Sequence, residues 1–494
     1  MSNPRSWRHL ARVVLELTTP MHIGAGREGE RADAEIARDA NGLPTIPGSS
    51  LAGVLRASLA ASYPNGAELA EEIFGFQRMR KSGAMAPADA RGSSLTVSWA
   101  SIHDSNNRPV DGIAEREHLK NDPILQAALS PTIRDHVRIS HLGAADARQS
   151  PDKGESTGEA GGRGKFDEMA VCTGHRFTFE MELAGDSKSV QNWNLLLDVL
   201  RDPALRIGAK TRRGFGAFRI VSISGASLCL DKEEDFASYS KHPAALSEQS
   251  PVLKTLDPLP AGRHSGTDVV ATLELEPEGY WMFGGGTDPS GFEGDEDMAP
   301  VRDKRVAWKD GKGELKENVI VIPGSSVKGA LAHRVAFHCN RLSGVYADKL
   351  DQEKLAEETG SSNEAVLEIF GSVKGKDSGS KGLLMIDDVM MDTEPNSQLV
   401  HHVSLDRFTG GAKAGFLFSE RPLWGGRISL SIRIAISGGV VSHTSRKALE
   451  SAIKDLAQGR LQIGAGSGRG LGYFTARDGV KWSDGGNWIN GGEK

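Results

Sequence analysis

The octapeptide IPGSSLAG occupies residues 46–53, and a similar octapeptide, IPGSSVKG, occupies residues 322–329. Each copy follows an extended apolar run, and behind the first copy Leu51, Val54, Leu55 and Leu59 fall at helical spacing. Proline fixes φ and glycine permits a tight approach, so each octapeptide predicts a sharp turn from a strand into a helix. We expect one serine to cap that helix, and its first backbone amides to point outward, where an anion binds.

Three further blocks surround both octapeptides in the same order. The pattern Asp, four residues, Arg-Asp stands upstream at 33–39 and 297–303, and EIFG follows at 72–75 and 368–371. A glycine loop closes each half, as IGAKTRRGFG at 207–216 and as IGAGSGRGLG at 463–472. The order is constant although the loop lengths between the blocks differ. The chain is therefore a tandem duplication.

Composition limits the class of protein. The 494 residues exceed one ordinary domain, and the net charge of −6 argues against a protein that coats nucleic acid with its whole surface. The 59 glycines gather in loops beside Lys and Arg, which suits backbone approach to phosphates. Three separated cysteines cannot form a disulfide framework, and there is no apolar run of membrane-spanning length and no signal peptide. We expect a cytoplasmic protein without a membrane partner.

The order of strand and helix patterns predicts the same fold for both halves. Each half reads as strand, helix, strand, arm, strand, helix and strand, which predicts an α+β ferredoxin-like (RRM-like) module. We place the first module at residues 1–229 and the second at 267–494, with a proline-rich connection at 230–266. The polar, glycine-rich residues 141–166 and residues 404–420 are the expected projecting arms.

The repeated blocks resemble the RAMP superfamily, the backbone subunits of type III CRISPR–Cas effector complexes. The resemblance is carried by HIGAG at 22–26, Asp-x4-Arg-Asp before IPGSS, the Ile-Phe-Gly helix end and the closing glycine loop. No single motif is specific, but their order occurs twice and covers nearly the whole chain. A double-module chain of this size resembles the tandem-fusion backbone subunit of type III-D-like complexes.

This resemblance implies an antiviral role in which the modules bind guide CRISPR RNA and each arm, or thumb, wedges into the guide–target duplex. It also implies a metal-dependent endoribonuclease, in which a loop aspartate cleaves single-stranded target RNA within a ribonucleoprotein. By spacing, that aspartate corresponds to Asp33 and, in the longer second loop, to Asp297. Both are expected to hold Mg²⁺ or another divalent cation. The implied protein partners are a large signalling subunit, small subunits and further RAMP backbone subunits.

Contacts to the RNA backbone are expected from the turns, the arms and the glycine loops, because Lys and Arg between glycines suit phosphate contacts without base readout. The expected RNA-binding residues are His22, Gly24, Ser49, Ser50, Arg56, Lys210, Arg212, Arg213, Ser325, Ser326, Lys328, Arg407 and Arg469. The two modules differ, since the family's lysine before the helix glycine is Ala52 in one and Lys328 in the other. His22 corresponds to Met282, and only the second arm entry, LDRFTG at 405–410, follows the family pattern. The guide contacts of the two modules are therefore expected to be unequal.

Other functions are weighed against this one. Nucleotide hydrolysis is disfavoured because no glycine precedes Lys210 in the way a P-loop requires. Zinc binding is disfavoured because His338-Cys339 and His401-His402 lack spaced partners. A guide-processing nuclease is disfavoured because His22 occurs in only one module. A non-catalytic guide-RNA scaffold and a duplicated structural protein whose glycine loops are only turns remain as alternatives.

Overall fold

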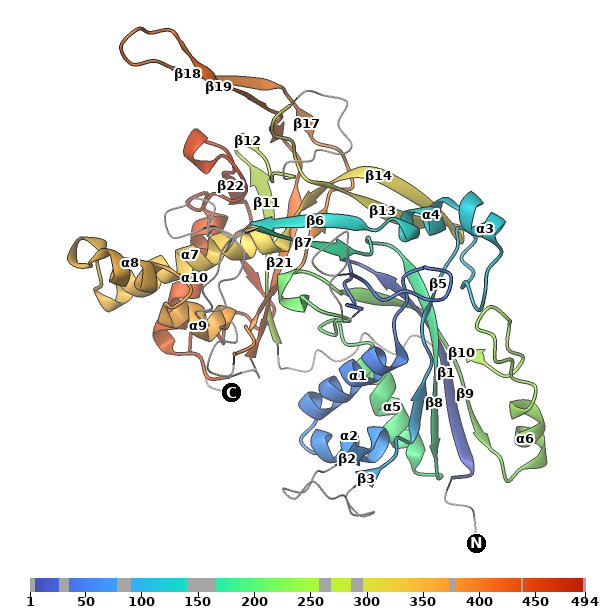
Figure 1. The fold of residues 1–494 in the computed structure, drawn as a ribbon. Coiled ribbons are helices and arrows are strands. Elements are labelled where there is room, and N and C mark those ends of the chain that lie inside the picture. Colours follow the sequence, from blue (N-terminus) through green and yellow to red (C-terminus); the bar gives the residue numbers. More distant parts are fainter. Residues whose placement is uncertain are drawn as a thin grey trace, which may run out of the picture.

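Two modules lie side by side in the computed structural model (Figure 1). The structure describes residues 5–25, 35–77, 90–137, 139, 165–256, 268–285, 296–372, 379–436 and 439–491. Asp33 and the tip of the first expected arm lie outside these residues.

The first module is built on a sheet whose strands run in the order β10-β9-β1-β8-β4, with β5 also paired to β8. Its elements in chain order are β1 (Trp7–Leu17), α1 (Gly48–Ser62), α2 (Gly66–Phe74), β2 (Phe76–Gln77), β3 (Ala90–Arg91), β4 (Leu95–Val97), β5 (Ser101–Ile102), α3 (Arg116–Asn121), α4 (Pro123–Leu129), β6 (Thr132–Val137), β7 (Lys165–Ala170), β8 (Arg176–Gly185), α5 (Ser189–Leu200), β9 (Phe218–Cys229), α6 (Glu233–Tyr239) and β10 (Lys254–Thr255).

The second module has a sheet in the order β15-β21-β11-β22, with β23 also paired to β11. Its elements in chain order are β11 (Asp268–Pro277), β12 (Tyr280–Trp281), β13 (Arg302–Lys309), β14 (Lys312–Ile322), α7 (Gly324–Ser343), α8 (Gln352–Thr359), α9 (Glu364–Phe370), β15 (Leu384–Ile386), β16 (Val389–Met390), β17 (Asn396–Ser397), β18 (Val400–Leu405), β19 (Ala412–Glu420), β20 (Leu423–Trp424), β21 (Ile428–Ala435), α10 (His443–Ala457), β22 (Phe474–Ala476) and β23 (Lys481–Trp482).

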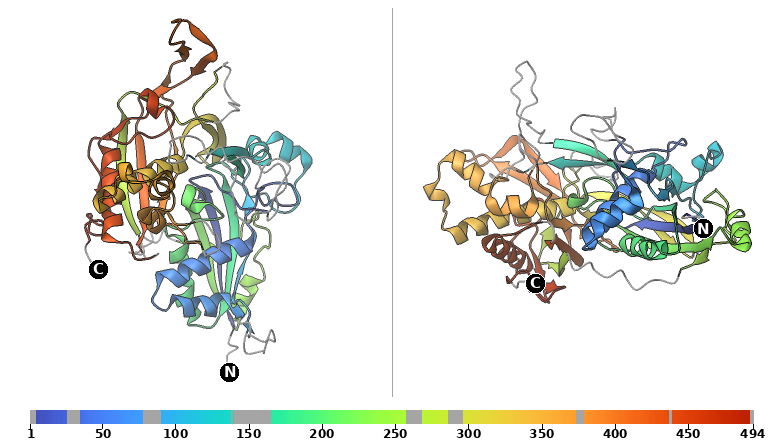
Figure 2. Two further views of the ribbon diagram at one scale, coloured as in Figure 1. Left: turned by 60° about the vertical axis from the view of Figure 1, so that its left-hand side comes forward. Right: turned by 90° about the horizontal axis from the view of Figure 1, so that it is seen from below.

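The two sheets have the same antiparallel topology, in which β1, β4, β8 and β9 correspond to β11, β15, β21 and β22. In each module the first strand lies in the middle of the sheet, and helices cover one face, α1 with α5 and α7 with α10 (Figure 2). This is the ferredoxin-like arrangement. The predicted pair of ferredoxin-like modules is confirmed.

Apolar periodicity explains why these segments form these elements. Strand β11 alternates strictly, with Val269, Ala271, Leu273 and Leu275 buried against the helices. Helix α1 buries Leu51, Leu55 and Leu59, one residue per turn, on the same core. Each module encloses its own hydrophobic cluster under its helices.

Several elements that were not predicted from the sequence extend the first module or join the two modules. The expected connection contains α6 and also β10, which pairs with β9, so the residues up to 256 pack on the first module. The hairpin of β13 and β14 replaces a single bridge between Arg38 and Pro44 in the first module. It reaches back over the first module, where the amide of Val306 donates to Thr173 O and the indole of Trp308 donates to Gly174 O.

Each module carries a two-stranded arm between its second and third sheet strands. Strands β18 and β19 project into solvent away from the body, and the β6–β7 pair extends from the first module over the second (Figure 1). Apolar residues of the second arm are strongly exposed, with Phe408 94% and Leu417 70% accessible. The two arms are therefore placed differently although their positions in the chain correspond.

Candidate nucleic-acid interface

A buried carboxylate joins the second arm to the second glycine loop. Glu420, at the end of β19, is 1% exposed, and its Oε1 lies 2.8 Å from His402 Nε2 on β18. Its Oε2 accepts from Arg469 Nη2 of the glycine loop at 2.5 Å. The imidazole of His402 stacks on the Phe418 ring, with centroids 4.8 Å apart, and the Arg469 guanidinium lies over the same ring.

The first module repeats the pair of a buried glutamate and a histidine, but its cation comes from another position of the glycine loop, since Lys210 aligns with Gly466 and not with Arg469. Glu168 on β7 is fully buried, and its carboxylate contacts His136 of β6 at 2.9 Å and the ammonium of Lys210 of the first glycine loop. Strand register makes the pairs equivalent, because each histidine lies opposite the residue two before its glutamate. Burial, then Arg213 and other nearby cations, lowers the pKa of His136 to about 4. Neither glutamate belongs to a repeated motif, so neither was among the residues predicted from the sequence.

Asp297 lies at the base of the second arm. Its Oδ2 accepts from the backbone amide of Ser419 at 2.8 Å and from the Ser419 hydroxyl at 3.2 Å. The Asp297 side chain is exposed, and both bonds from Ser419 go to Oδ2 and not to Oδ1. The adjacent Glu296 is buried and paired with Arg421. Asp297 therefore offers one exposed carboxylate beside the strand that ends in Glu420. A single carboxylate ligand suits a divalent cation that keeps most of its bound waters.

A cavity of about 310 Å³ opens between the second arm and the second glycine loop. It is lined by His402, Val403, Ser404, Gly415, Phe416, Leu417, Phe418 and Arg469. Aromatic rings and a guanidinium are groups on which a nucleobase can stack. The arm base thus combines an apolar recess with a cation that is held in place by a buried carboxylate.

The two octapeptide turns begin helices as predicted, but no serine side chain caps either helix. In the second module the amide of Gly324, the first residue of α7, donates to Asp388 Oδ1 at 2.8 Å. A carboxylate of the chain itself therefore occupies the expected anion position there. The residue equivalent to Asp388 in the first module is Trp99, which is 57% exposed.

The first glycine loop packs against the second module instead of standing open to solvent. Arg212 donates from Nη1 to Leu383 O at 3.3 Å, and Lys328 donates to both Arg212 O and Leu384 O at 2.9 Å. Gly214, at φ +95°, approaches so closely that a Cβ there would lie 2.8 Å from Ile386 O. Lys210, Arg212 and Lys328 are thus engaged within the protein, and Arg213 remains exposed.

A buried ionic cluster holds this junction between the modules. Arg134, on the first arm, is 9% exposed and pairs with Asp303 and Asp388 of the second module. Thr132 adds a hydrogen bond to Asp303 at 2.7 Å, and Arg206 pairs with Asp387 at 2.8 Å. Because buried charges are tolerated only with partners, this cluster fixes how the modules meet. Asp303 belongs to a repeated motif, but its counterpart Asp39 only closes a local turn onto Asn41 and Leu43.

The remaining predicted RNA-binding residues include both buried and exposed side chains. His22 is buried, with Nδ1 2.8 Å from Met169 O. The exposed residues are Gly24, Ser49, Arg56, Ser326 and Arg407, whereas Ser50 and Ser325 are partly buried. Arg407 lies at the turn of the second arm, between β18 and β19.

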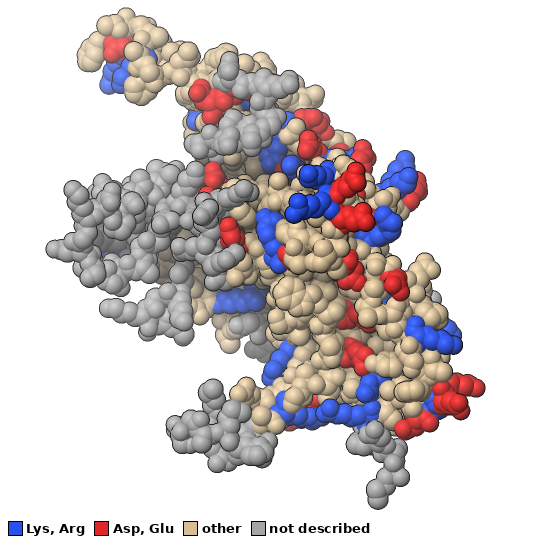
Figure 3. All heavy atoms as spheres, turned by 45° about the vertical axis from the view of Figure 1, so that its right-hand side comes forward, with Lys and Arg blue, Asp and Glu red and all other residues tan. Residues whose placement is uncertain are grey.

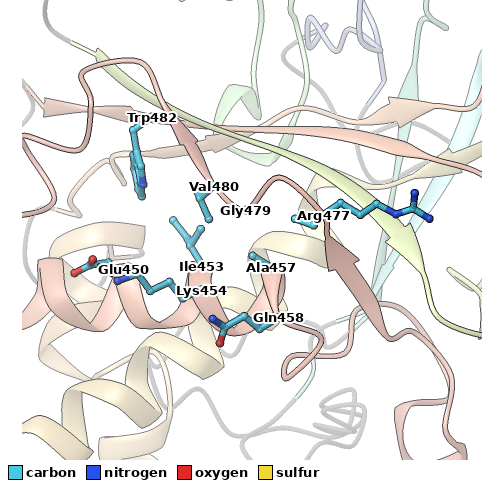
Figure 4. Close-up of a pocket in the computed structure, with 10 residues that line it drawn as sticks. Glu450, Ile453, Lys454, Ala457, Gln458, Arg477, Gly479, Val480 and Trp482 are labelled. Atoms are coloured by element: carbon cyan, nitrogen blue, oxygen red, sulfur yellow. Dashed lines mark hydrogen bonds and ion pairs between the residues drawn. The ribbon is translucent and has the colours of Figure 1, made fainter.

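Two other features of the described residues are separate from this region. Asp104, His118 and Asp122 lie within 4.8 Å of one another, but both carboxylates already accept backbone amides, Asp104 from Asn106 and Asp122 from Ile124. A second cavity, of about 390 Å³, lies between α10 and the segment that joins β22 to β23, where Ile453, Val480 and Trp482 face one another (Figure 4). None of the predicted RNA-binding residues lines it.

On the coloured part of the face shown in Figure 3, Lys and Arg lie beside Asp and Glu. In the part of the chain that the structure describes, no helix is both long enough and apolar enough to span a membrane.

Comparison with known proteins identifies the family. The family model of the RAMP superfamily matches residues 14–219 and 274–475, which are the two modules. The chain belongs to the RAMP superfamily. No curated protein matches it at a significant level.

Among solved structures, a chain of the type III-B Cmr-beta complex bound to cognate target RNA is 18% identical, with a TM-score of 0.28. That match covers 44% of the present chain and 60% of the other, so the chain accounts for less than two thirds of its length. A TM-score this low supports no inference about function.

Proposed function

We propose that the protein is a backbone subunit of a type III CRISPR effector that binds guide RNA and cleaves target RNA at Asp297. The observation that carries the proposal is the arm base of the second module. There the exposed Asp297 carboxylate, the Arg469 guanidinium and an aromatic recess adjoin the strand that ends at Glu420. RAMP membership of both halves supports the class of ligand. Guide RNA, target RNA and other effector subunits are the proposed partners.

The RNA contacts proposed here are fewer than the sequence indicated. Lys210 is held by Glu168 at the base of the first arm, whereas Arg212 and Lys328 form hydrogen bonds between the two modules. The exposed cations Arg56 and Arg407 are the phosphate contacts proposed here. Phe408 and Leu417 on the second arm would wedge between bases, and the recess beside Phe418 would receive a displaced base.

The chemistry proposed for cleavage is attack by the 2′-oxygen of the target on its adjacent phosphorus, which forms a 2′,3′-cyclic phosphate and breaks the P–O5′ bond. The 2′-hydroxyl proton passes to water, and the departing 5′-oxygen takes a proton from water to leave as a hydroxyl. Asp297 would hold a hydrated Mg²⁺, which when bound supplies positive charge to the phosphate and an acidic water. Ser419 fixes the carboxylate through Oδ2, so its direction is set before RNA arrives. Arg469 is already oriented by Glu420 and would contact the phosphate as charge develops there. Asp33 would serve the first module in the same way.

Guide binding tests the first half of this proposal. The variant Arg56→Gln with Arg407→Gln should bind guide RNA more weakly for every sequence, and the salt dependence of log K should flatten by about one unit per lost contact. Arg477→Gln is the matched control, because this exposed arginine pairs with Glu276 beside β22. An unchanged salt slope in the double variant would reject the backbone contacts. If the wild-type protein binds guide RNA and also cleaves target RNA, it is a nuclease. If it binds guide RNA without cleaving target RNA, it is the non-catalytic scaffold.

A further inference from the structure

The second arm has two faces, because side chains alternate along β18 and β19. His402 and Glu420 lie on one face and bond to each other. His401 lies on the opposite face, directly across from Ser419 in the strand register. Asp297, the proposed cation ligand, accepts from both the amide and the hydroxyl of Ser419. His401 and Asp297 are therefore both neighbours of Ser419.

The backbone of Ser419 sets how close the His401 side chain lies. Ser419 donates its amide to Asp297 and accepts from the amide of Met298 through its carbonyl, so both backbone groups point away from β18. His401 and Ser419 thus form a non-hydrogen-bonded pair, in which the Cα atoms are about 4.5 Å apart and the side chains are closest. The Asp297 carboxylate lies 2.8 Å from the Ser419 amide nitrogen. The imidazole and the carboxylate therefore border the same part of the arm base.

The charged groups around Ser419 are already engaged. Asp297 bonds to Ser419 through Oδ2, and its Oδ1 is the proposed cation ligand. A carboxylate that holds a cation is a poor proton acceptor, because the cation stabilises its charged form. Glu296 and Arg421, which follow next along the two segments, pair with each other. The proton of the target's 2′-hydroxyl therefore needs another acceptor at this place.

His401 is a titratable group that can accept that proton. Its side chain is exposed, and in the part of the chain that the structure describes no hydrogen bond or ion pair engages its ring. An imidazole gains and loses a proton near neutral pH, which suits general acid–base catalysis. In the first arm the equivalent position is Asp135, which lies opposite Asp167 in the same register. The imidazole is therefore present in the second arm and not in the first.

We propose that His401 is the general base for the cut made at Asp297, an inference that rests on the proposed function. One ring nitrogen takes the proton of the 2′-hydroxyl, in place of water, while the 2′-oxygen forms its bond to phosphorus. The bond from phosphorus to the 5′-oxygen breaks, and that oxygen takes a proton from water. The imidazolium then releases its proton to solvent, which restores the base for the next cut.

The rate of each cut, measured separately in a complex reconstituted with guide RNA and Mg²⁺, tests this role. At saturating target RNA, His401→Gln should slow the cut that depends on Asp297 about 100-fold and leave the cut assigned to Asp33 unchanged. In the wild type the rate of the Asp297 cut should rise with pH and level off above about pH 7, where an imidazole has lost its proton. In the variant the rate should keep rising, because hydroxide becomes the base. His443→Gln, which changes an exposed histidine at the start of α10, is the matched control and should alter neither cut.

Two further measurements separate a base from a cation ligand or a structural residue. The Mg²⁺ concentration that gives half the maximal rate should be the same in His401→Gln and the wild type, and imidazole added to His401→Ala should restore part of the Asp297 cut. The inference is overturned, while the proposed function stands, if Asp297→Asn erases the cut but His401→Gln keeps the wild-type rate and pH profile. It is equally overturned if His401→Gln only raises the Mg²⁺ requirement, or slows the cut by the same factor at every pH. If Asp297→Asn leaves all cuts in place, the proposed function fails and the inference fails with it.

Discussion

The position of Lys328 has different roles in the two modules. Its counterpart is Ala52, and its ammonium lies between the modules, bonded to Arg212 O and Leu384 O. Burial, followed by the charges of Arg212 and Arg213, lowers the pKa of Lys328 to about 7. The family lysine of the second module therefore serves the junction in this structure.

The lowered pKa of Lys328 predicts a pH dependence of stability. Between pH 7 and the ordinary pKa of 10.5, the unfolded chain holds a proton that the folded chain has lost, so stability rises with pH. From pH 7 to pH 9 the wild type should gain about 2 kcal/mol of unfolding free energy relative to Lys328→Met. Urea denaturation at the two pH values measures this difference. Parallel pH profiles for the two proteins would show that Lys328 stays protonated.

At the scale of elements, the buried Glu420 and Glu168 each hold a projecting arm against a glycine loop. Glu420 binds one group from β18 and one from the glycine loop, so a single carboxylate couples three segments. Glu168 does the same in the first module. This coupling orients each arm relative to the loop that approaches it.

Loss of that carboxylate should loosen the arm without unfolding the module. Glu420→Gln removes the charge that holds His402 and Arg469, and amide exchange of 400–405 and 412–420 should become faster. The control Glu394→Gln affects an exposed pair with Arg302 and should leave arm exchange unchanged. Equal exchange in wild type and Glu420→Gln would mean that strand pairing alone fixes the arm.

The exposed apolar arm should act on RNA and contribute little to folding. Phe408 is 94% exposed, so Phe408→Ser should change the unfolding free energy by less than about 0.5 kcal/mol. Target-RNA affinity of the guide-loaded protein should fall, because one wedge is lost. Leu342→Ser, an exposed apolar residue on α7, is the matched control. If Phe408→Ser binds target RNA as tightly as the wild type, Phe408 does not insert between the bases.

For the whole molecule, the sequence predicted the modules well because periodicity and repeated turns are local signals. The helices predicted to begin at the two octapeptides are α1 and α7. The junction could not be predicted, because Arg134 and Asp388 are 254 positions apart and neither belongs to a turn or an apolar pattern. One signal was present in the sequence: Asp387 and Asp388 directly follow the buried strand β15. Two adjacent carboxylates at the end of a buried strand need cationic partners, which indicates a contact with basic residues.

The junction should dominate the stability of the paired modules. Arg134→Ala leaves Asp303 and Asp388 buried without their cation, which should cost about 3–5 kcal/mol. Arg305→Ala removes an exposed pair with Asp392 and should cost less than about 1 kcal/mol. Thermal unfolding of both variants measures the contrast. Similar small losses would show that the β13–β14 hairpin, and not the ionic cluster, holds the modules together.

The most direct test is to map the cuts in a target RNA. In a reconstituted complex with guide RNA and Mg²⁺, Asp297→Asn should erase one cut and leave target binding intact, because asparagine can still accept from Ser419. Asp33→Ala should erase a different cut, Asp392→Ala should erase none, and EDTA should silence all of them. If Asp297→Asn leaves every cut in place, the protein does not cleave RNA at its second arm base, and the central claim is wrong.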